Sequence, residues 1–377
     1  MNAMRGAIHL GRVGETAIDI HVTFIPVLIW AACLGLVQYG GLDGAAFGVT
    51  AIILLFGCVL VHELAHTLYA LSTGVFVDYI ILLPIGGLTS LDTFAIKPGD
   101  EVRMALVGPL ANLVLGALLG LGLLGAGMVQ HMDLTTLSNQ ALAQPSLLGI
   151  LVYLTVANLM LAVFNLLPAI PLDGGRALRA LLSRRMSFEE ATHRAAIAGR
   201  SIGAGLVSMG GVLMLLGEWY YGVALGLVGL ALYGSATYED RVVQQHAALN
   251  AWTVAEVLNR EALTLAPHEM LSLALDSLVR GQVVPVVVGS GPLRIIGLLT
   301  ANELRQAARA GETTRLSAAH VMRTRFPSVR SSDPLWVAYE KLLRSHLYAI
   351  PVVSQNVYSG LITLADIRRT VRNSRLP

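Results

Sequence analysis

The chain has 377 residues, of which 55% are hydrophobic and only 13% are charged, and its formal net charge is +2. A soluble protein of this size normally carries about 25% charged residues, so the composition favours a membrane protein. The small net charge and the lack of a basic run exclude nucleic acid as an expected partner.

Lysine and arginine are missing from three long stretches of the sequence, residues 13–96, 104–175 and 201–240. One transmembrane helix needs about 20 apolar residues to cross about 30 Å of hydrocarbon. Each stretch therefore has room for two helices that leave the basic side of the membrane and return to it. We expect a polytopic α-helical membrane protein with six transmembrane helices, near residues 20–39, 46–72, 101–130, 146–168, 197–217 and 219–238.

The distribution of positive charge also predicts the topology. Basic residues stay on the cytoplasmic side of a membrane. We therefore expect a multi-pass protein of the inner or plasma membrane whose N-terminus and C-terminal part, after Arg241, are cytoplasmic. The N-terminal residues lack the apolar core and cleavage site of a signal peptide, so we expect a short cytoplasmic lead-in there.

Residues 76–94, FVDYIILLPIGGLTSLDTF, follow the second expected span. They are rich in β-branched residues and are interrupted by Pro84, Gly86 and Gly87, so they are too short and too broken for another span. A membrane tolerates extended backbone only where protein or a cavity shields it. We expect a re-entrant β-hairpin, and an ordinary interfacial loop is the alternative.

The second expected span contains the sequence LVHELAHTLYA, residues 60–70. His62 and His66 are four residues apart and share one helix face, with Glu63 beside them. Two neutral imidazoles bind Zn²⁺, the metal lowers the pKa of water to about 7, and a glutamate takes the proton. Because ionisable groups inside a membrane are costly and usually functional, we predict a zinc site. Histidines that pair structurally between helices are the alternative.

Catalytic zinc usually has three protein ligands, so a third is expected elsewhere. Asp173 lies in FNLLPAIPLDGGR, at the end of the fourth expected span and just before Arg176. By the expected spans, His66 lies about 9 Å from the cytoplasmic end of its helix, at 1.5 Å per residue. Asp173 lies near the same side of the membrane. We therefore expect it to complete the site, and an aspartate of a turn or helix end is the alternative.

HELAH together with NLLPAIPLDGG resembles the site-2 protease family of intramembrane zinc metalloproteases, over about residues 1–240. This resemblance implies a zinc metalloendopeptidase that binds one Zn²⁺ per chain. His62, His66 and Asp173 would be its metal ligands, and Glu63 would be the catalytic base.

The resemblance also implies residues that contact the substrate. Asn165, eight residues before the aspartate as in the family pattern, would hold the substrate or the oxyanion, with a helix–helix hydrogen bond as the alternative. GPLAN resembles the family's G-x-x-x-N motif, which makes Asn112 a candidate substrate contact, whereas helix packing is the alternative for both Gly108 and Asn112. In the family, an extended substrate is thought to pair with the re-entrant hairpin, which implies contacts at Ile80 and Leu82.

After Arg241 the composition becomes that of a soluble domain, and residues 263–304 align with residues 326–367. Each copy predicts an amphipathic helix, a β-branched strand, a second strand and a helix. One copy cannot bury its sheet alone, so we expect the two to fold together. The residues that recur are Pro285 with Pro351, Gly297 with Gly360, and Thr300 with Thr363.

These copies resemble a tandem pair of CBS modules, whose G-φ-φ-T-x-x-D pattern (φ is apolar) matches GLITLAD. The resemblance implies that Thr363 and Asp366, and in the first copy Thr300 and Glu303, contact the ribose of ATP or another adenine nucleotide. Glu303 is one methylene longer than the aspartate of the pattern, and a dimerising module without a ligand is the alternative. CBS pairs often dimerise, so we expect a homodimer through these modules.

The expected organisation is an intramembrane protease domain at 1–240, a linker at 241–252 and a cytosolic α/β tandem CBS domain at 253–377, with modules 253–308 and 316–372. The predicted function is cleavage of transmembrane segments of membrane-tethered regulatory proteins, modulated by a nucleotide-sensing CBS pair. A CBS-regulated membrane channel or transporter is the alternative, because several transport families also carry CBS pairs. The metal triad favours the protease, and no rows of charge at span centres mark an ion path. A protease-like protein that does not cut is disfavoured because Glu63 is present.

Overall fold

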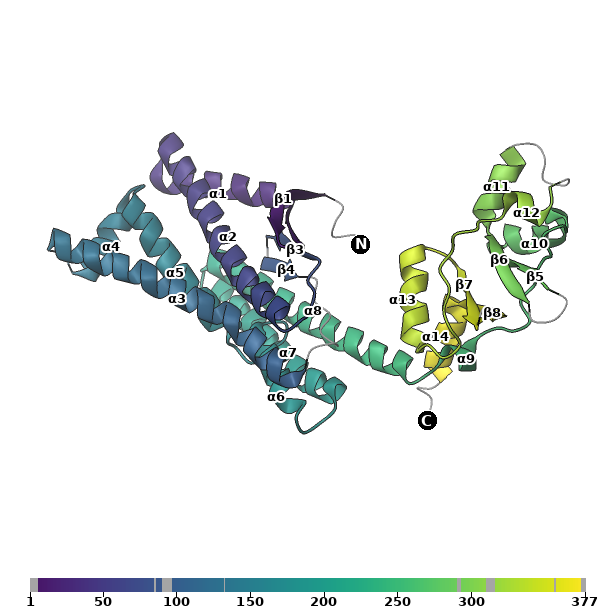
Figure 1. Cartoon of the computed structure of the whole chain (residues 1–377). Helices are drawn as coiled ribbons and strands as arrows, with labels where there is room; N and C mark the ends of the chain where they lie inside the picture. Colours follow the sequence, from purple (N-terminus) through teal and green to yellow (C-terminus); the bar gives the residue numbers. More distant parts are fainter. Residues whose placement is uncertain are drawn as a thin grey trace. The chain divides into compact units, whose positions relative to one another are not determined.

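The structure is a computed structural model that describes residues 6–84, 86–89, 97–131, 133–289, 293–309, 316–355 and 357–373. The chain divides into two compact units, Met1–Arg241 and Val242–Pro377. The helices that begin in the first unit are α1 (Phe24–Tyr39), α2 (Gly41–Ser72), α3 (Pro98–Gln130), α4 (Leu134–Ala143), α5 (Leu147–Asn165), α6 (Asp173–Leu182), α7 (Phe188–Leu215) and α8 (Trp219–Asn250) (Figure 1).

Five of the described helices, α2, α3, α5, α7 and α8, are long and apolar enough to cross a membrane. Their outer faces carry large exposed apolar side chains, among them Leu118, Leu121 and Leu227, which lipid rather than water accommodates. Helix α1 is also apolar but has only 16 residues. The structure therefore supports a membrane protein, and the number of six spans remains a prediction.

The first unit also contains a four-stranded sheet in the order β1 (Ala7–Val13), β2 (Thr16–His21), β3 (Tyr79–Leu83) and β4 (Gly86–Thr89). Strands β2 and β3 are parallel, and the other neighbours are antiparallel. The β3–β4 hairpin falls within residues 76–94, for which we predict a hairpin, although residues 85 and 90–94 lie outside the described part. Its re-entrant position in the membrane remains a prediction.

The N-terminal residues differ from the expected lead-in, because they form strands β1 and β2. The first helix consequently begins at Phe24 rather than near residue 20, since Ile20 and His21 still pair with β1. The Thr16 hydroxyl donates a hydrogen bond to the carbonyl oxygen of Val77 over 2.8 Å and joins the N-terminal hairpin to the approach of β3.

Helix α6 is anchored in the first unit by a buried arginine. Arg179 donates hydrogen bonds to Glu101 at the start of α3 and, over 2.7 Å, to Glu239 of α8. Helix α6 lies beside one end of α3, and α4 lies near the other (Figure 1). The charge of Arg179 is thus neutralised inside the protein, and α6 is joined to two long helices.

Residues 241–252, where we expect a linker, belong largely to helix α8, which continues to Asn250. Leu249 is buried in the core of the second unit together with Val254 and Leu335. These residues are therefore part of a folded unit rather than a separate connection.

The second unit repeats one supersecondary pattern, as the sequence predicts. In each copy a helical segment precedes an antiparallel strand pair and a following helix, and both strand pairs have a bulge at the same place, after Val286 and after Val352. A shared apolar cluster of Val283, Leu298, Ala349 and Leu361 contains residues of both copies. The elements are α9 (Val254–Val257), η2 (Leu271–Ala274), α10 (Leu275–Val279), β5 (Val284–Val288), β6 (Arg294–Leu299) and α11 (Ala301–Arg309), then α12 (Ala318–Val321), α13 (Leu335–Ser345), β7 (Ala349–Ser354), β8 (Val357–Thr363) and α14 (Leu364–Asn373).

Candidate metal centre

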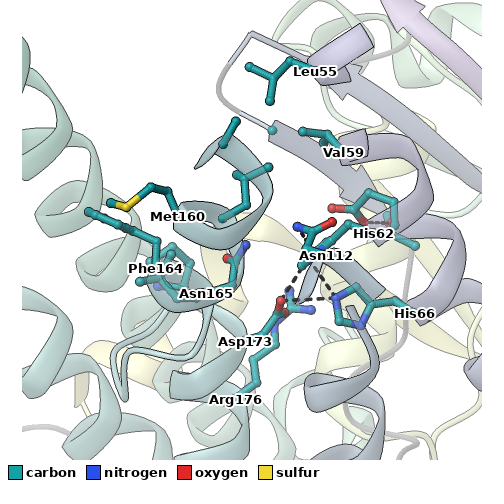
Figure 2. Close-up of a pocket in the computed structure, with 18 residues that line it drawn as sticks. Leu55, Val59, His62, His66, Asn112, Met160, Phe164, Asn165, Asp173 and Arg176 are labelled. Carbon is teal, nitrogen blue, oxygen red and sulfur yellow. Dashed lines mark hydrogen bonds and ion pairs between the residues drawn. The ribbon is translucent and has the colours of Figure 1, made fainter. Parts of the chain in front are cut away.

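Helix α2 places two of the predicted ligands side by side. His62 and His66 are one helical turn apart, and their Nε2 atoms lie 3.2 Å from each other. Both side chains are almost completely buried, with 6% and 5% of their surface exposed. In Figure 2 they lie on the same wall of a cavity.

Asp173 completes a cluster of three. Its Oδ2 atom lies 3.1 Å from Nε2 of His62 and 3.2 Å from Nε2 of His66. The residue is not the end of the fourth long helix, as the expected spans place it, but the first residue of the separate helix α6. The loop 166–172 leads from α5 to this position, and Arg179 anchors the helix that carries it.

The three atoms are spaced nearly as the ligands of a tetrahedral metal are. Ligands about 2.0–2.2 Å from zinc at tetrahedral angles are about 3.3–3.6 Å apart. The observed separations of 3.1, 3.2 and 3.2 Å are close to this range. Within the described part of the chain, these three residues form a cluster that could hold a metal ion.

The donors and acceptors around His66 also fit a cation. Nδ1 of His66 lies 2.7 Å from the carbonyl oxygen of Met104, which accepts hydrogen bonds only. In the neutral ring the proton is then on Nδ1, and Nε2 directs a lone pair toward the cluster. The lone pair of Nε2 of His66 therefore faces the Asp173 carboxylate oxygen across 3.2 Å, an approach of two acceptors that a cation between them would stabilise.

Glu63 lies beside the cluster and against strand β4. The Thr89 hydroxyl donates a hydrogen bond of 2.6 Å to Oε2 of Glu63. A Cβ atom at Gly87 would lie 2.3 Å from Cγ of Glu63, so only glycine lets the carboxylate side chain pass so close to the strand. The hairpin and the glutamate are thus in direct contact.

The cluster opens into a cavity of about 690 Å³. Its lining includes His62, Glu63, His66 and Asp173, together with Gly86, Gly87 and Thr89 of β4. Across the cavity, α5 contributes Met160, Phe164 and Asn165 (Figure 2). The lining thus combines apolar side chains with a few polar groups at one end, as small-molecule and peptide sites do.

The predicted substrate contacts divide into two groups. Asn112 and Asn165 both line the cavity, and Asn112 additionally contacts His62. Ile80 and Leu82 do not line it, because β3 is paired on both sides and these side chains are 0% and 3% exposed. The prediction of substrate pairing at Ile80 and Leu82 is therefore corrected, since an interior strand has no free backbone edge.

The sequence assigns one residue of the site, Gly108, to another role and gives no signal for several others. We attribute Gly108 to helix packing, but a Cβ atom there would lie 2.2 Å from Nε2 of His66 and 2.8 Å from Cε1 of His62. The spacing of the G-x-x-x-N motif is the signal that identifies this position. Thr89, Arg176 and the Met104 carbonyl also belong to the site, and the last has no residue-type signal at all.

The candidate nucleotide residues lie close together in pairs in the second unit. The Thr363 hydroxyl donates to Oδ2 of Asp366 over 2.6 Å, and Thr300 donates in the same way to Glu303. The longer glutamate thus reaches its threonine, and it also forms an ion pair with Arg323 over 3.4 Å.

A buried cluster of two histidines and an aspartate, with a glutamate at its side and set among helices of membrane length, is the constellation of a membrane metalloprotease. The profile of peptidase family M50 matches residues 50–209, and the CBS-domain profile matches residues 318–373. A zinc metalloprotease of Methanocaldococcus jannaschii is 30% identical over 277 residues, which are 74% of this chain and 73% of that protein.

Two further matches cover 95% of their own length. The protein Rip3 of Mycobacterium tuberculosis is 28% identical over 99% of this chain and 95% of its own length. The solved structure of a site-2 protease from M. jannaschii has 32% identity and a TM-score of 0.44, covering 62% of this chain and 95% of that chain. The chain belongs to peptidase family M50, the site-2 protease family. It is a zinc metalloprotease with a C-terminal CBS domain.

Proposed function

We propose that His62, His66 and Asp173 hold the zinc ion and that Glu63 is the catalytic base. The observation that supports this most directly is the convergence of the three buried ligand atoms at 3.1–3.2 Å from one another. When bound, zinc acts as a Lewis acid that lowers the pKa of water and polarises the scissile carbonyl.

In this proposal, Glu63 takes a proton from the attacking water and later passes it to the nitrogen of the leaving peptide. The hydrogen bond from Thr89 holds the carboxylate at the edge of the cavity. The Asn165 amide, on the α5 wall, donates to the substrate carbonyl as negative charge develops on its oxygen. Glu63 and Asn165 line the same cavity as the three proposed ligands, which supports these roles.

The substrate in this proposal is a transmembrane segment of a membrane-tethered regulatory protein. A helix hides its peptide bonds in its own hydrogen bonds, so the segment must unwind locally before it is cut. Within the described residues, β4 pairs with β3 on one side only, and Gly86, Gly87 and Thr89 line the cavity. An unwound segment therefore pairs along β4, which brings its backbone beside Glu63.

The second unit, in this proposal, binds an adenine nucleotide and modulates access to the cavity. Thr363 and Asp366 would contact the ribose of a nucleotide at the second copy, and Thr300 and Glu303 that of a nucleotide at the first copy. Calorimetry of the full chain with ATP, ADP and AMP tests this, and Asp366→Asn is expected to abolish heat from the second site. Heat that persists unchanged in this variant contradicts the assignment.

The remaining parts of the proposal concern the cell. The protein is inserted in the inner or plasma membrane with its N-terminus and CBS domain in the cytoplasm, and it dimerises through the CBS modules. Cysteines introduced near Gly14 and Gly281 are then labelled only after the membrane is permeabilised. Labelling of either site in intact cells contradicts this topology.

The decisive experiment compares wild type with Glu63→Gln. We expect this variant to retain one zinc ion per chain and to lose cleavage of membrane-tethered candidate substrates, because the base is removed and the ligands are kept. Asp173→Ala is expected to lose both zinc and cleavage. Normal cleavage by Glu63→Gln rules out the proposed base.

A further inference from the structure

One face of helix α3 lies against both histidines. Met104, Gly108 and Asn112 follow one another at intervals of four residues, so they lie along a single stripe of the helix. The Met104 carbonyl contacts Nδ1 of His66, and Gly108 leaves room for both rings. The third position, Asn112, has its Nδ2 atom 3.2 Å from Nδ1 of His62.

The contact with Asn112 decides which nitrogen of His62 carries the proton. If the amide NH₂ donates to Nδ1, the proton of the neutral ring is on Nε2, and His62 cannot bind a metal through that atom. If the amide is turned by half a revolution, its oxygen accepts from Nδ1–H, and Nε2 presents a lone pair. The two ends of an amide are distinguished only by the hydrogen bonds that they make.

Two observations favour the turned amide. Oδ1 of Asn112 is buried without a hydrogen-bond partner in the described structure, and turning the amide gives this oxygen a donor. At His66, one turn along the helix, Nδ1–H likewise donates to an oxygen of α3, the Met104 carbonyl. With both Nδ1–H groups donating to α3, the two Nε2 atoms face Asp173 as acceptors.

We propose that Asn112 is a positioning residue that fixes the metal-binding tautomer and the ring orientation of His62. This inference rests on the proposed zinc ligands and replaces the expected substrate contact at Asn112. Hydrogen-bonding partners of metal-binding histidines typically change metal affinity 10–100-fold when they are removed. Helix α3 thus orients both histidines, His66 through the Met104 carbonyl and His62 through the Asn112 side chain.

The test measures the zinc affinity of the full chain by competition with a chelator. Asn112→Leu removes the acceptor at similar volume and is expected to weaken zinc binding about 10–100-fold. Asn112→Asp keeps an acceptor for Nδ1–H and is expected to restore an affinity within a few-fold of wild type. The absorption spectrum of the cobalt(II)-loaded chain should change in the leucine variant and return in the aspartate variant.

Asn158 provides a matched control. It is as completely buried as Asn112, on helix α5, and its amide donates to the Leu154 carbonyl rather than to a histidine. Asn158→Leu is expected to leave zinc affinity and the cobalt spectrum unchanged, even if it lowers the melting temperature of the apoprotein. An equal loss of affinity in this control means that a general packing defect causes the effect, and it overturns the inference.

The remaining outcomes are distinct. Wild-type affinity in Asn112→Leu, or no rescue by Asn112→Asp, overturns the role of Asn112 and leaves the zinc ligands in place. If the wild type binds zinc and His66→Ala binds it equally well, the proposed zinc ligands are wrong, and the inference about Asn112 falls with them.

Discussion

A single methyl group at Gly108 should weaken binding of the proposed zinc ion while leaving the fold in place. An added Cβ atom would lie 2.2 Å from Nε2 of His66 and 2.6 Å from Cε1 of the same ring. Ordinary contact begins at 3.4 Å, so the ring must move by about 1.2 Å. Zinc sites tolerate ligand distances only within about 0.2 Å, so this displacement would break the proposed bond from Nε2 of His66 to zinc.

The expected loss follows from this geometry. Changes in the partners of a zinc ligand already weaken binding 10–100-fold, so displacing the ligand itself should weaken it by about 100-fold or more. That factor corresponds to about 2.8 kcal/mol of binding free energy. The change also replaces a helix-interior glycine by alanine, which favours the helix by about 1 kcal/mol. Gly108→Ala should therefore remain folded with weakened metal binding.

The assay is zinc content after dialysis, together with chelator competition, thermal unfolding and substrate cleavage. Gly120→Ala on the same helix is the control, because its Cβ atom meets only Thr155 Cγ2 at an ordinary 3.6 Å. This control should bind zinc and cleave as wild type does. Wild-type zinc affinity in a folded Gly108→Ala variant would refute the reasoning, since the added methyl group and the bound ring occupy the same space.

Two further substitutions test the proposed base apart from the proposed zinc ligands, and the stability of the surrounding helices apart from both. Gly87→Ala places a Cβ atom 2.5 Å from Oε1 of Glu63. Because misplacing a reacting group by about 1 Å costs about 100-fold in rate, cleavage should fall by that factor while the zinc content stays normal. Loss of zinc from this variant contradicts the prediction. Arg179→Met leaves Glu101 buried without its partner and should lower the free energy of unfolding by about 3–5 kcal/mol. Chemical denaturation measures this loss of stability. As the control, Arg194→Met breaks the exposed ion pair with Glu190 and should lower the free energy of unfolding by less than about 1 kcal/mol. Equal losses of stability in the two variants contradict the prediction.

Local features of the sequence were sufficient for the parts of the molecule that depend on short spacings. His62 and His66 share a face because a helix turns every 3.6 residues, and this holds in any context. The absence of basic residues over long stretches predicts membrane helices because the bilayer excludes charge. The two copies in the C-terminal part were recognisable because Gly297 and Thr300 recur as Gly360 and Thr363 at the same interval.

Tertiary contacts were needed wherever a partner is distant in the chain or carries no side-chain signal. The Met104 carbonyl contacts His66 through a backbone atom that every residue possesses, so no residue type marks it. Among the described residues, β4 and not β3 has an unpaired edge at the cavity, because β2, about 60 residues earlier, occupies the other side of β3. Asp173 meets the histidines through the packing of helix α6, which Arg179 joins to α3 and α8. Such pairings depend on how whole elements pack, which local patterns do not specify.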